Sequence, residues 1–127
     1  MLTDTIVAVA TPNGRGGIGI VRLSGPKAMK VASKVVSVKL LRSRTTSYTD
    51  FFDAEGNKID TGLVVFFEAP NSYTGEHVIE MHMHGNPIIL GEMVIACCEL
   101  DVRPARPGEF TERAFRAGKI NLLQAEA

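Results

Sequence analysis

Short apolar runs rich in β-branched residues alternate along this chain with segments of helical spacing, and this alternation constrains the fold more than any other feature. Strand-like runs occupy residues 5–10, 18–23, 63–67 and 78–84. Helical patterns occupy residues 26 to about 37, 87 to about 99 and 109 to about 117. Because strands and helices interleave, the sequence predicts an α/β (α+β) domain, in which a mixed β-sheet is packed with helices.

Capping and turn residues mark the ends of these elements. Asn86 before Pro87 is a good N-cap, and Gly118 suits the position after the last helical turn. Residues 41–61 are polar and rich in turn formers, with a hairpin tip predicted at residues 53–57. A short strand is expected around Val102.

Composition excludes several classes of protein. No apolar run approaches the roughly 18 residues that a membrane span needs, and no signal-like leader opens the chain. The two cysteines, Cys97 and Cys98, are neighbours that cannot join distant segments, and they fall within an apolar helix as core residues. A cytoplasmic protein without membrane contact is therefore expected.

The formal net charge of zero conceals an asymmetry between the two halves of the chain. Residues 1–49 contain eight basic residues and one acidic residue, whereas residues 50–127 contain six basic and thirteen acidic residues. The halves could neutralise each other within one fold or across a symmetric dimer. The lysines at 27, 30 and 34 fit either a solvated helix face or an anion-binding surface.

Residues 14–19 match the dinucleotide-binding pattern G-x-G-x-x-G. That pattern requires a helix directly after the glycines and an acidic residue about 20 positions further on. Here a strand is predicted to follow, and residues 33–49 contain no Asp or Glu. The match is interpreted as accidental, with the glycines allowing a tight loop or a close approach to the backbone. The chain contains no P-loop motif.

Two charged residues interrupt strands that otherwise read as apolar. Arg22 lies in Ile-Val-Arg-Leu and Glu80 in Val-Ile-Glu-Met. A buried charge is costly unless it is paired, so these residues form either a structural ion pair or the lining of a polar pocket. His82 and His84 share a strand face with Glu80, but this loose pattern does not define a metal site, and no metal ligands are assigned.

The last third of the chain adds two observations. Arg113, Arg116 and Lys119 recur at a spacing of three, which is typical of a solvated helix edge. Residues 121–124 have the capping-box pattern of a new helix, three residues before the sequence stops. We therefore expect the sequence to be a fragment of a longer protein. No arrangement of Ser, Cys or His indicates a catalytic nucleophile, and no catalytic residue is assigned.

Three stretches together resemble one family in its own order. They are DTIVAVATPNGRGGIGIVRLSG at residues 4–25, PNSYTGE at 70–76 with Glu80 and His84-Gly, and RPGEFTERAF at 106–115 continuing to Lys119 and QAEA at 124–127. The chain is thereby similar to the amino-terminal part of the tRNA-modification GTPases called MnmE or TrmE. The resemblance divides it into a folate-binding and dimerisation domain at residues 1–119 and the start of a truncated helical domain at residues 120–127.

The resemblance implies a fold like the tetrahydrofolate-binding domain of the glycine-cleavage aminomethyltransferase. It implies a site for 5-formyl- or 5,10-methylenetetrahydrofolate, with the family's folate contacts falling on Arg22, Glu80 and Lys119. A carboxylate can accept paired hydrogen bonds from the aminopyrimidine edge of a pterin, and the two cations suit its carbonyl groups or glutamate tail. One further family contact lies near the carboxyl end of the full-length protein, so the fragment should bind weakly and catalyse nothing.

The resemblance also implies a homodimer and a larger reaction. The full-length proteins work with the FAD-containing partner MnmG to install a carboxymethylaminomethyl or aminomethyl group on carbon 5 of the wobble uridine of tRNA. Their GTP, Mg²⁺ and K⁺ sites lie in a GTPase domain beyond this sequence. The alternatives are a purely structural dimerisation module, a stand-alone folate-dependent aminomethyl- or formyltransferase, and a tRNA-binding module. Neutral net charge and few aromatic residues disfavour the last of these.

Overall fold

One mixed sheet of six strands forms the centre of the domain. The computed structural model describes residues 4–10, 17–39, 41–121 and 123. The strands are β1 (Ile6–Val9), β2 (Ile18–Ser24), β3 (Thr46–Phe52), β4 (Lys58–Phe67), β5 (Val78–His84) and β6 (Arg103–Pro104), in the spatial order β3-β4-β5-β2-β1-β6. All pairings are antiparallel except that of β1 with β6. The predicted α/β class with a mixed sheet is confirmed.

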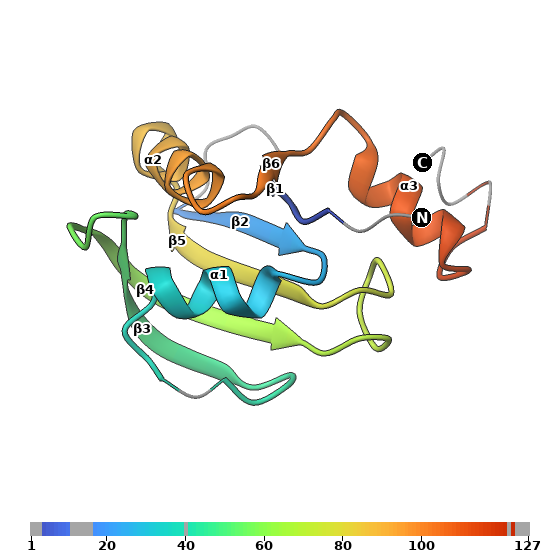
Figure 1. Ribbon diagram of the computed structural model, residues 1–127, viewed down its shortest axis with the longest axis horizontal. Helices are drawn as coiled ribbons and strands as arrows, with labels where there is room; N and C mark the ends of the chain where they lie inside the picture. The colour runs from blue at the N-terminus through green and yellow to red at the C-terminus, as the bar shows by residue number, and fades with distance from the viewer. Residues whose placement is uncertain (1–3, 11–16, 40, 122, 124–127) are drawn as a thin grey trace.

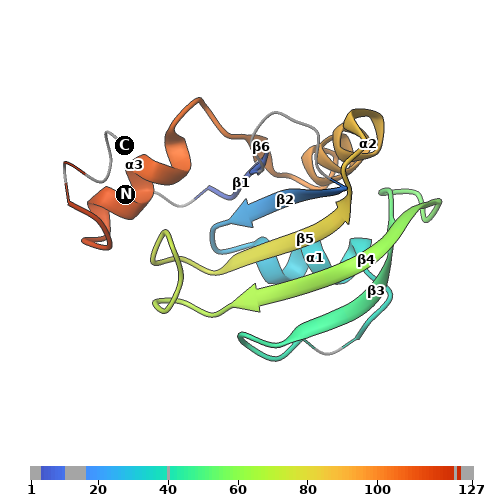
Figure 2. The same cartoon turned by 180° about the vertical axis from the view of Figure 1, so that it is seen from behind.

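Of the three helices in the described part of the chain, two cover one face of the sheet and leave the other face open. The helices are α1 (Ala28–Val35), α2 (Pro87–Cys98) and α3 (Glu109–Arg116). Figure 1 shows α1 in front of the sheet, and the reverse view in Figure 2 shows the strands in front of α1. Alternate residues of β2 and β5, such as Val21 and Met81, are buried in the core that α1 and α2 complete. Their neighbours Arg22 and Glu80 therefore face the open side.

The strand predictions hold except in the polar segment. β1, β2 and β5 lie where apolar runs predicted them, β6 follows Val102, and a turn occupies the predicted hairpin tip. The strands on either side of that tip were not predicted from the polar residues 41–61, but β3 lies within them and β4 begins at Lys58, before the predicted apolar run at 63–67. β3 is an edge strand with one open face, so polar residues suit it. Its buried Thr49 hydroxyl accepts a hydrogen bond from the Ser37 N–H at 3.0 Å and donates to the Asp50 carbonyl at 2.9 Å.

The helix ends follow the predicted capping chemistry. The Asn86 side chain accepts hydrogen bonds from the N–H groups of Ile88 and Ile89, at 2.8 and 3.4 Å. Gly118 has a φ of +75° just after α3, as a residue at this position often does. The predicted helix start at residues 121–124 lies mostly outside the described residues. None of the helices in the described ranges has the length and apolar character needed to cross a membrane.

The last glycine of the G-x-G-x-x-G match has a packing role. β2 begins at Ile18, so a strand and not a helix follows these glycines, as predicted; residues 11–16 themselves lie outside the described ranges. An ideal Cβ on Gly19 would lie 2.5 Å from the Cδ1 atom of Leu90. The absence of a side chain at Gly19 therefore lets Leu90, near the start of α2, pack directly against the β2 backbone.

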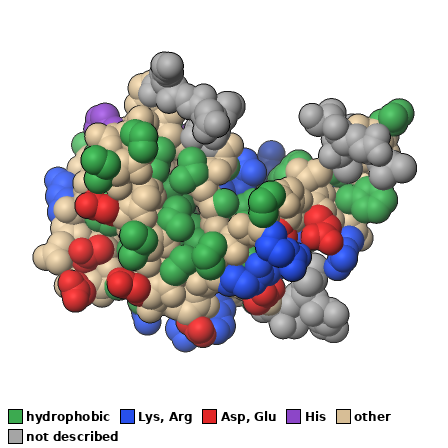
Figure 3. Space-filling view, turned by 90° about the horizontal axis from the view of Figure 1, so that it is seen from above, with side chains coloured by type: hydrophobic (Ala, Val, Ile, Leu, Met, Phe, Trp, Pro, Cys, Tyr) green, Lys and Arg blue, Asp and Glu red, His purple; other side chains and the backbone are tan. Residues whose placement is uncertain are grey.

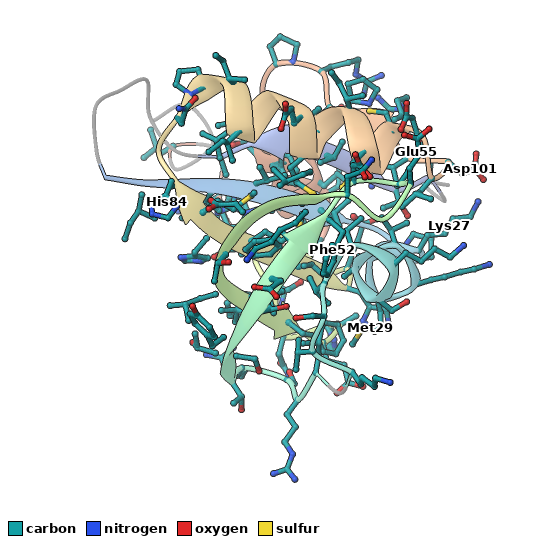
Figure 4. The ribbon with its side chains drawn as sticks, turned by 90° about the vertical axis from the view of Figure 1, so that its left-hand side faces the viewer. Lys27, Met29, Phe52, Glu55, His84 and Asp101 are labelled. Carbon is teal, nitrogen blue, oxygen red and sulfur yellow. The ribbon has the colours of Figure 1, made fainter. Side chains whose placement is uncertain are left out.

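The charged halves of the chain meet at several points on the surface. Lys30 and Lys34 are exposed on α1, and so is Lys27 just before it. Lys27 forms an ion pair with Asp101 beyond α2, and both side chains project at the same side of the molecule in Figure 4. Figure 3, which looks down on the face that includes α2, shows apolar side chains interspersed with charged ones. Ile88 and Ile95 of α2 are 72% and 60% exposed.

Candidate functional site

Arg22 and Glu80 are paired across the centre of the sheet. They are direct partners in the antiparallel register of β2 and β5. The Nη2 atom of Arg22 lies 2.9 Å from Oε2 of Glu80, and its Nε donates to the same oxygen at 3.1 Å. Their side chains retain 22% and 18% of their exposure, so the pair is partly shielded from water. The structure thus brings together two of the three predicted site residues.

His82 and His84, on the same strand as Glu80, contact two different carboxylates. His82 Nε2 lies 3.2 Å from Oε1 of Glu80, whereas His84 Nδ1 lies 2.8 Å from Oδ1 of Asp60. The shared strand face predicted for Glu80, His82 and His84 is present, but His84 is 70% exposed and belongs to a separate pair. Within the described ranges, no group of three or more His, Cys, Asp or Glu side chains is arranged to hold a metal ion.

Two aromatic rings flank the Arg22 guanidinium. Its central carbon lies 5.6 Å from the ring centroid of Tyr73, in the loop before β5, and 5.6 Å from that of Phe110, in α3. The Tyr73 hydroxyl lies 3.3 Å from Oγ1 of Thr111, which joins the loop to the helix. Sequence reasoning missed both aromatics, although each lies within a stretch that carries the family resemblance.

A cavity of about 500 Å³ opens beside this ion pair. Its lining comes from the turn before β3, the end of β4, the loop before β5, β5 itself and the segment after α3, and consists of Arg44, Phe67, Asn71, Ser72, Tyr73, Val78, Glu80, Lys119 and Ile120. This volume falls within the range of small-molecule sites. Glu80 and Lys119 therefore face one cavity, and Arg22 contacts one of its wall residues.

Close packing of the loop on the end of α3 places Lys119. Gly75 has a φ of +81°, and an ideal Cβ there would lie 2.8 Å from the Ala117 Cβ and 3.7 Å from the Lys119 Cε. A side chain at Gly75 would thus be strained and would collide with the end of the helix. The Lys119 N–H donates to the Ala114 carbonyl at 2.9 Å, which fixes the backbone just after α3.

Arg113 is buried, contrary to the prediction of a solvated helix edge. Its side chain is only 2% exposed, while that of Arg116 is 58% exposed. Arg113 donates to Oε1 of Glu76 at 2.9 Å and to Oδ1 of Asp4 at 2.7 Å. Because α3 packs against the chain start and the loop before β5, these carboxylates can neutralise a buried guanidinium that the helical spacing alone would place in water.

Glu109 completes this buried ionic cluster. Its side chain is 1% exposed and accepts hydrogen bonds from Arg103 at 2.6 and 3.0 Å. Those hydrogen bonds, together with the Arg106 backbone N–H, lower the pKa of Glu109 from 4.5 to about 2 despite its burial. These ion pairs hold α3 against the sheet. They thereby also position Phe110, within α3, and Lys119, which follows it.

Comparison with known proteins identifies the family. Residues 5–119 match the family described as "GTP-binding protein TrmE N-terminus". The chain belongs to the TrmE family. Its relatives include the tRNA modification GTPase MnmE of Pseudomonas aeruginosa strain UCBPP-PA14, which is 54% identical over 125 residues that span 98% of this chain and 27% of the relative. The corresponding proteins of Xanthomonas campestris pv. campestris strain 8004 and Photobacterium profundum are 52% and 51% identical.

The chain spans about a quarter of the length of these relatives. Coverage is 99% of this chain and 28% of the Xanthomonas protein, and 98% and 28% for the Photobacterium protein. The matched region includes Arg22, Glu80 and Lys119. All residues that line the cavity therefore fall within the matched region, except Ile120.

Proposed function

We propose that this domain binds a reduced folate, 5-formyl- or 5,10-methylenetetrahydrofolate, in the cavity beside the Arg22–Glu80 pair. The observation that carries the proposal is the convergence of Glu80 and Lys119 on one cavity of about 500 Å³, together with family membership. A fold like the tetrahydrofolate-binding domain of the glycine-cleavage aminomethyltransferase is part of the same proposal.

The chemistry of the donor set fits a folate. The Glu80 carboxylate can accept two hydrogen bonds from the aminopyrimidine edge of the pterin. Arg22 holds that carboxylate in place through two hydrogen bonds, and Lys119 supplies a cation for a carbonyl or carboxylate group. Phe67 and Tyr73 provide apolar walls for flat rings. When bound, the folate would supply the one-carbon unit, while this chain's residues bind and orient it.

The proposal extends to the longer protein. The relatives are tRNA modification GTPases that are more than three times as long as the matched region. The parent would act with MnmG, an FAD protein, on carbon 5 of the tRNA wobble uridine in the cytoplasm. Residues 1–119 would form the folate-binding and dimerisation domain, residues 120–127 would begin a helical domain, and GTP, Mg²⁺ and K⁺ would bind elsewhere in the parent.

Homodimerisation is the second part of the proposal. The sheet face that α1 and α2 leave open carries exposed apolar side chains, including Ile18 at 64%, Tyr48 at 74% and Leu63 at 40%. Sedimentation equilibrium should show a dimer that Tyr48→Asp weakens and Ile95→Asp, on α2, leaves intact. A monomer at all concentrations would contradict this part of the proposal for the isolated domain.

Calorimetric titration of 5-formyltetrahydrofolate into the 127-residue chain tests folate binding. Glu80→Gln and Lys119→Ala should each weaken binding about tenfold or more, equivalent to about 1.4 kcal/mol, because each removes one charged contact. Lys58→Ala is the matched control, since Lys58 is exposed and does not line the cavity. Weakening by the control to the same extent would contradict the assignment.

A purely structural dimerisation module is the alternative, and the observed Arg22–Glu80 ion pair favours it specifically. A structural pair predicts that Arg22→Ala and Glu80→Ala both lower stability while the wild-type domain binds no folate. A stand-alone aminomethyltransferase predicts turnover by this chain without further domains. Measuring unfolding of both variants beside the titration separates these functions.

A further inference from the structure

A second cation lines the same cavity as Glu80 and Lys119. Arg44 belongs to the turn that precedes β3, about 75 residues before Lys119 in sequence, yet both residues contribute to the one cavity wall. Neither strand periodicity nor the family resemblance singled out Arg44. The position of its side chain nevertheless follows from specific contacts in the turn.

The turn at residues 43–45 is fastened to the end of β4. The Arg44 N–H donates to the Phe66 carbonyl at 2.6 Å, and Ser43 forms a parallel bridge with Phe66. The Ser43 hydroxyl also accepts a hydrogen bond from the Glu68 N–H at 3.1 Å. Arg44 itself has a φ of +64°, a backbone conformation that non-glycine residues seldom adopt. The hydrogen bonds of the turn therefore stabilise a conformation that is intrinsically unfavourable for arginine. The turn therefore presents Arg44 to the cavity in one defined conformation.

The guanidinium of Arg44 is oriented by an aromatic ring. Its central carbon lies 5.8 Å from the ring centroid of Phe67, and both residues line the cavity. A guanidinium stacked in this way keeps its edge N–H groups available for a planar anion. A carboxylate matches that edge, because it can accept two parallel hydrogen bonds from it.

The charges around the cavity favour an anionic ligand. The carboxylate of Glu80 is already neutralised by Arg22 and contacts His82. Across the described ranges, by contrast, the guanidinium of Arg44 and the ammonium of Lys119 form no ion pair or side-chain hydrogen bond with a carboxylate. Because Glu80 is neutralised by Arg22, the cavity wall has a surplus of positive charge from Arg44 and Lys119.

We propose that Arg44 binds a carboxylate of the ligand in this cavity and makes the site selective for ligands with an anionic tail. The inference rests on the proposed function: for a reduced folate, the pterin end lies at Glu80 and a glutamyl carboxylate at Arg44. Tail-less pterins would lose the contact with Arg44 and keep the contact with Glu80.

Calorimetry with two ligands tests the role of Arg44. The wild-type 127-residue chain is titrated with 5-formyltetrahydrofolate and with 5-formyl-6-methyltetrahydropterin, which lacks the aminobenzoyl-glutamate tail and so has no carboxylate. Arg44→Ala should weaken folate binding about tenfold and leave binding of the tail-less pterin unchanged, and Arg44→Lys should restore part of the loss. Arg42→Ala is the matched control, because Arg42 is an exposed arginine two residues away that does not line the cavity.

A second variant separates binding from folding of the turn. Glycine adopts positive φ readily, so Arg44→Gly removes the side chain while it preserves the turn. Thermal unfolding of this variant should match the wild type, with the same tenfold loss of folate affinity. Equal weakening for both ligands, or none for either, would overturn the role of Arg44 even though folate binding itself is upheld.

The tail half of the ligand, N-(4-aminobenzoyl)-L-glutamate, distinguishes failure of this inference from failure of the proposed function. Binding of this compound that is lost in Arg44→Gly, with no preference for any pterin, would uphold the anion site and overturn folate as the ligand. Absence of binding for all three compounds to the wild-type chain would overturn both.

Discussion

Neutralising Glu109 should destabilise the domain by a calculable amount. Its pKa falls from 4.5 to about 2 in the folded chain, chiefly because Arg103 donates hydrogen bonds to it. A difference of about 2.5 in pKa corresponds to about 3 kcal/mol of unfolding free energy at neutral pH. Glu109→Gln should therefore lower stability by about 3 kcal/mol at pH 7, and the melting temperature by about 10 °C for a domain of this size.

The stability lost in Glu109→Gln should depend on pH in a defined direction. Because the pKa of Glu109 is depressed on folding, its stabilising contribution is complete above pH 4.5 and disappears as the pH falls toward 2. Urea unfolding followed by circular dichroism at pH 7, 5, 3.5 and 2 would measure the free-energy difference between wild type and Glu109→Gln. The difference should remain constant from pH 7 to 5 and shrink steadily below that.

Glu112→Gln is the matched control on the same helix. The Glu112 side chain is 41% exposed and pairs with Arg116, which is 58% exposed, so its removal should cost less than about 1 kcal/mol. The reasoning is refuted if Glu109→Gln and Glu112→Gln have equal effects at pH 7. It is refuted equally by a Glu109→Gln deficit that stays the same down to pH 2.

Four further outcomes follow from backbone packing, helix capping and thiol burial. Gly62→Ala should unfold the domain or cost more than about 2 kcal/mol, since an ideal Cβ would lie 2.1 Å from a neighbouring strand's carbonyl oxygen. Gly91→Ala, in α2 with nothing within 4 Å, should instead stabilise by up to about 1 kcal/mol in urea unfolding. Asn86→Ala should lower the unfolding free energy by about 1 kcal/mol through loss of the α2 cap, and a change below 0.3 kcal/mol would contradict the cap. Burial raises the pKa of the Cys97 thiol to about 12, so iodoacetamide at pH 8 should modify Cys98 first; mass spectrometry would detect the opposite order.

Local periodicity predicted the central strands and the helices because, in these elements, the spacing of apolar residues along the chain matches the positions that are buried. β5 was predicted with its observed bounds, and the charges of Arg22 and Glu80 stood out against apolar neighbours, so their proximity could be anticipated. β3 could not be recognised in the same way. Its open face and edge position permit polar residues, and the bonding of its buried Thr49 depends on Ser37, which lies in a different segment.

The rest of the candidate site depends on contacts between distant segments. Arg113 has the spacing of a surface residue, and only the approach of Asp4 and Glu76 explains its burial. Tyr73 and Phe110 meet at Arg22 because the loop before β5 packs against α3. Such meetings depend on the assembled fold, so residue type and periodicity in one sequence could not reveal them.

The ion pairs that Asp4 forms with Arg103 and Arg113 limit how early the domain can fold during synthesis. Asp4 is held by Arg103 and Arg113, and β1 lies between β2 and β6, so the start of the chain is completed by residues made about a hundred positions later. A nascent chain that ends before Arg103 leaves one edge of β1 without its β6 partner. On the ribosome, the sheet can therefore be completed only after β6 has emerged, and the ion pair that joins Asp4 to α3 can form only after Arg113 has emerged.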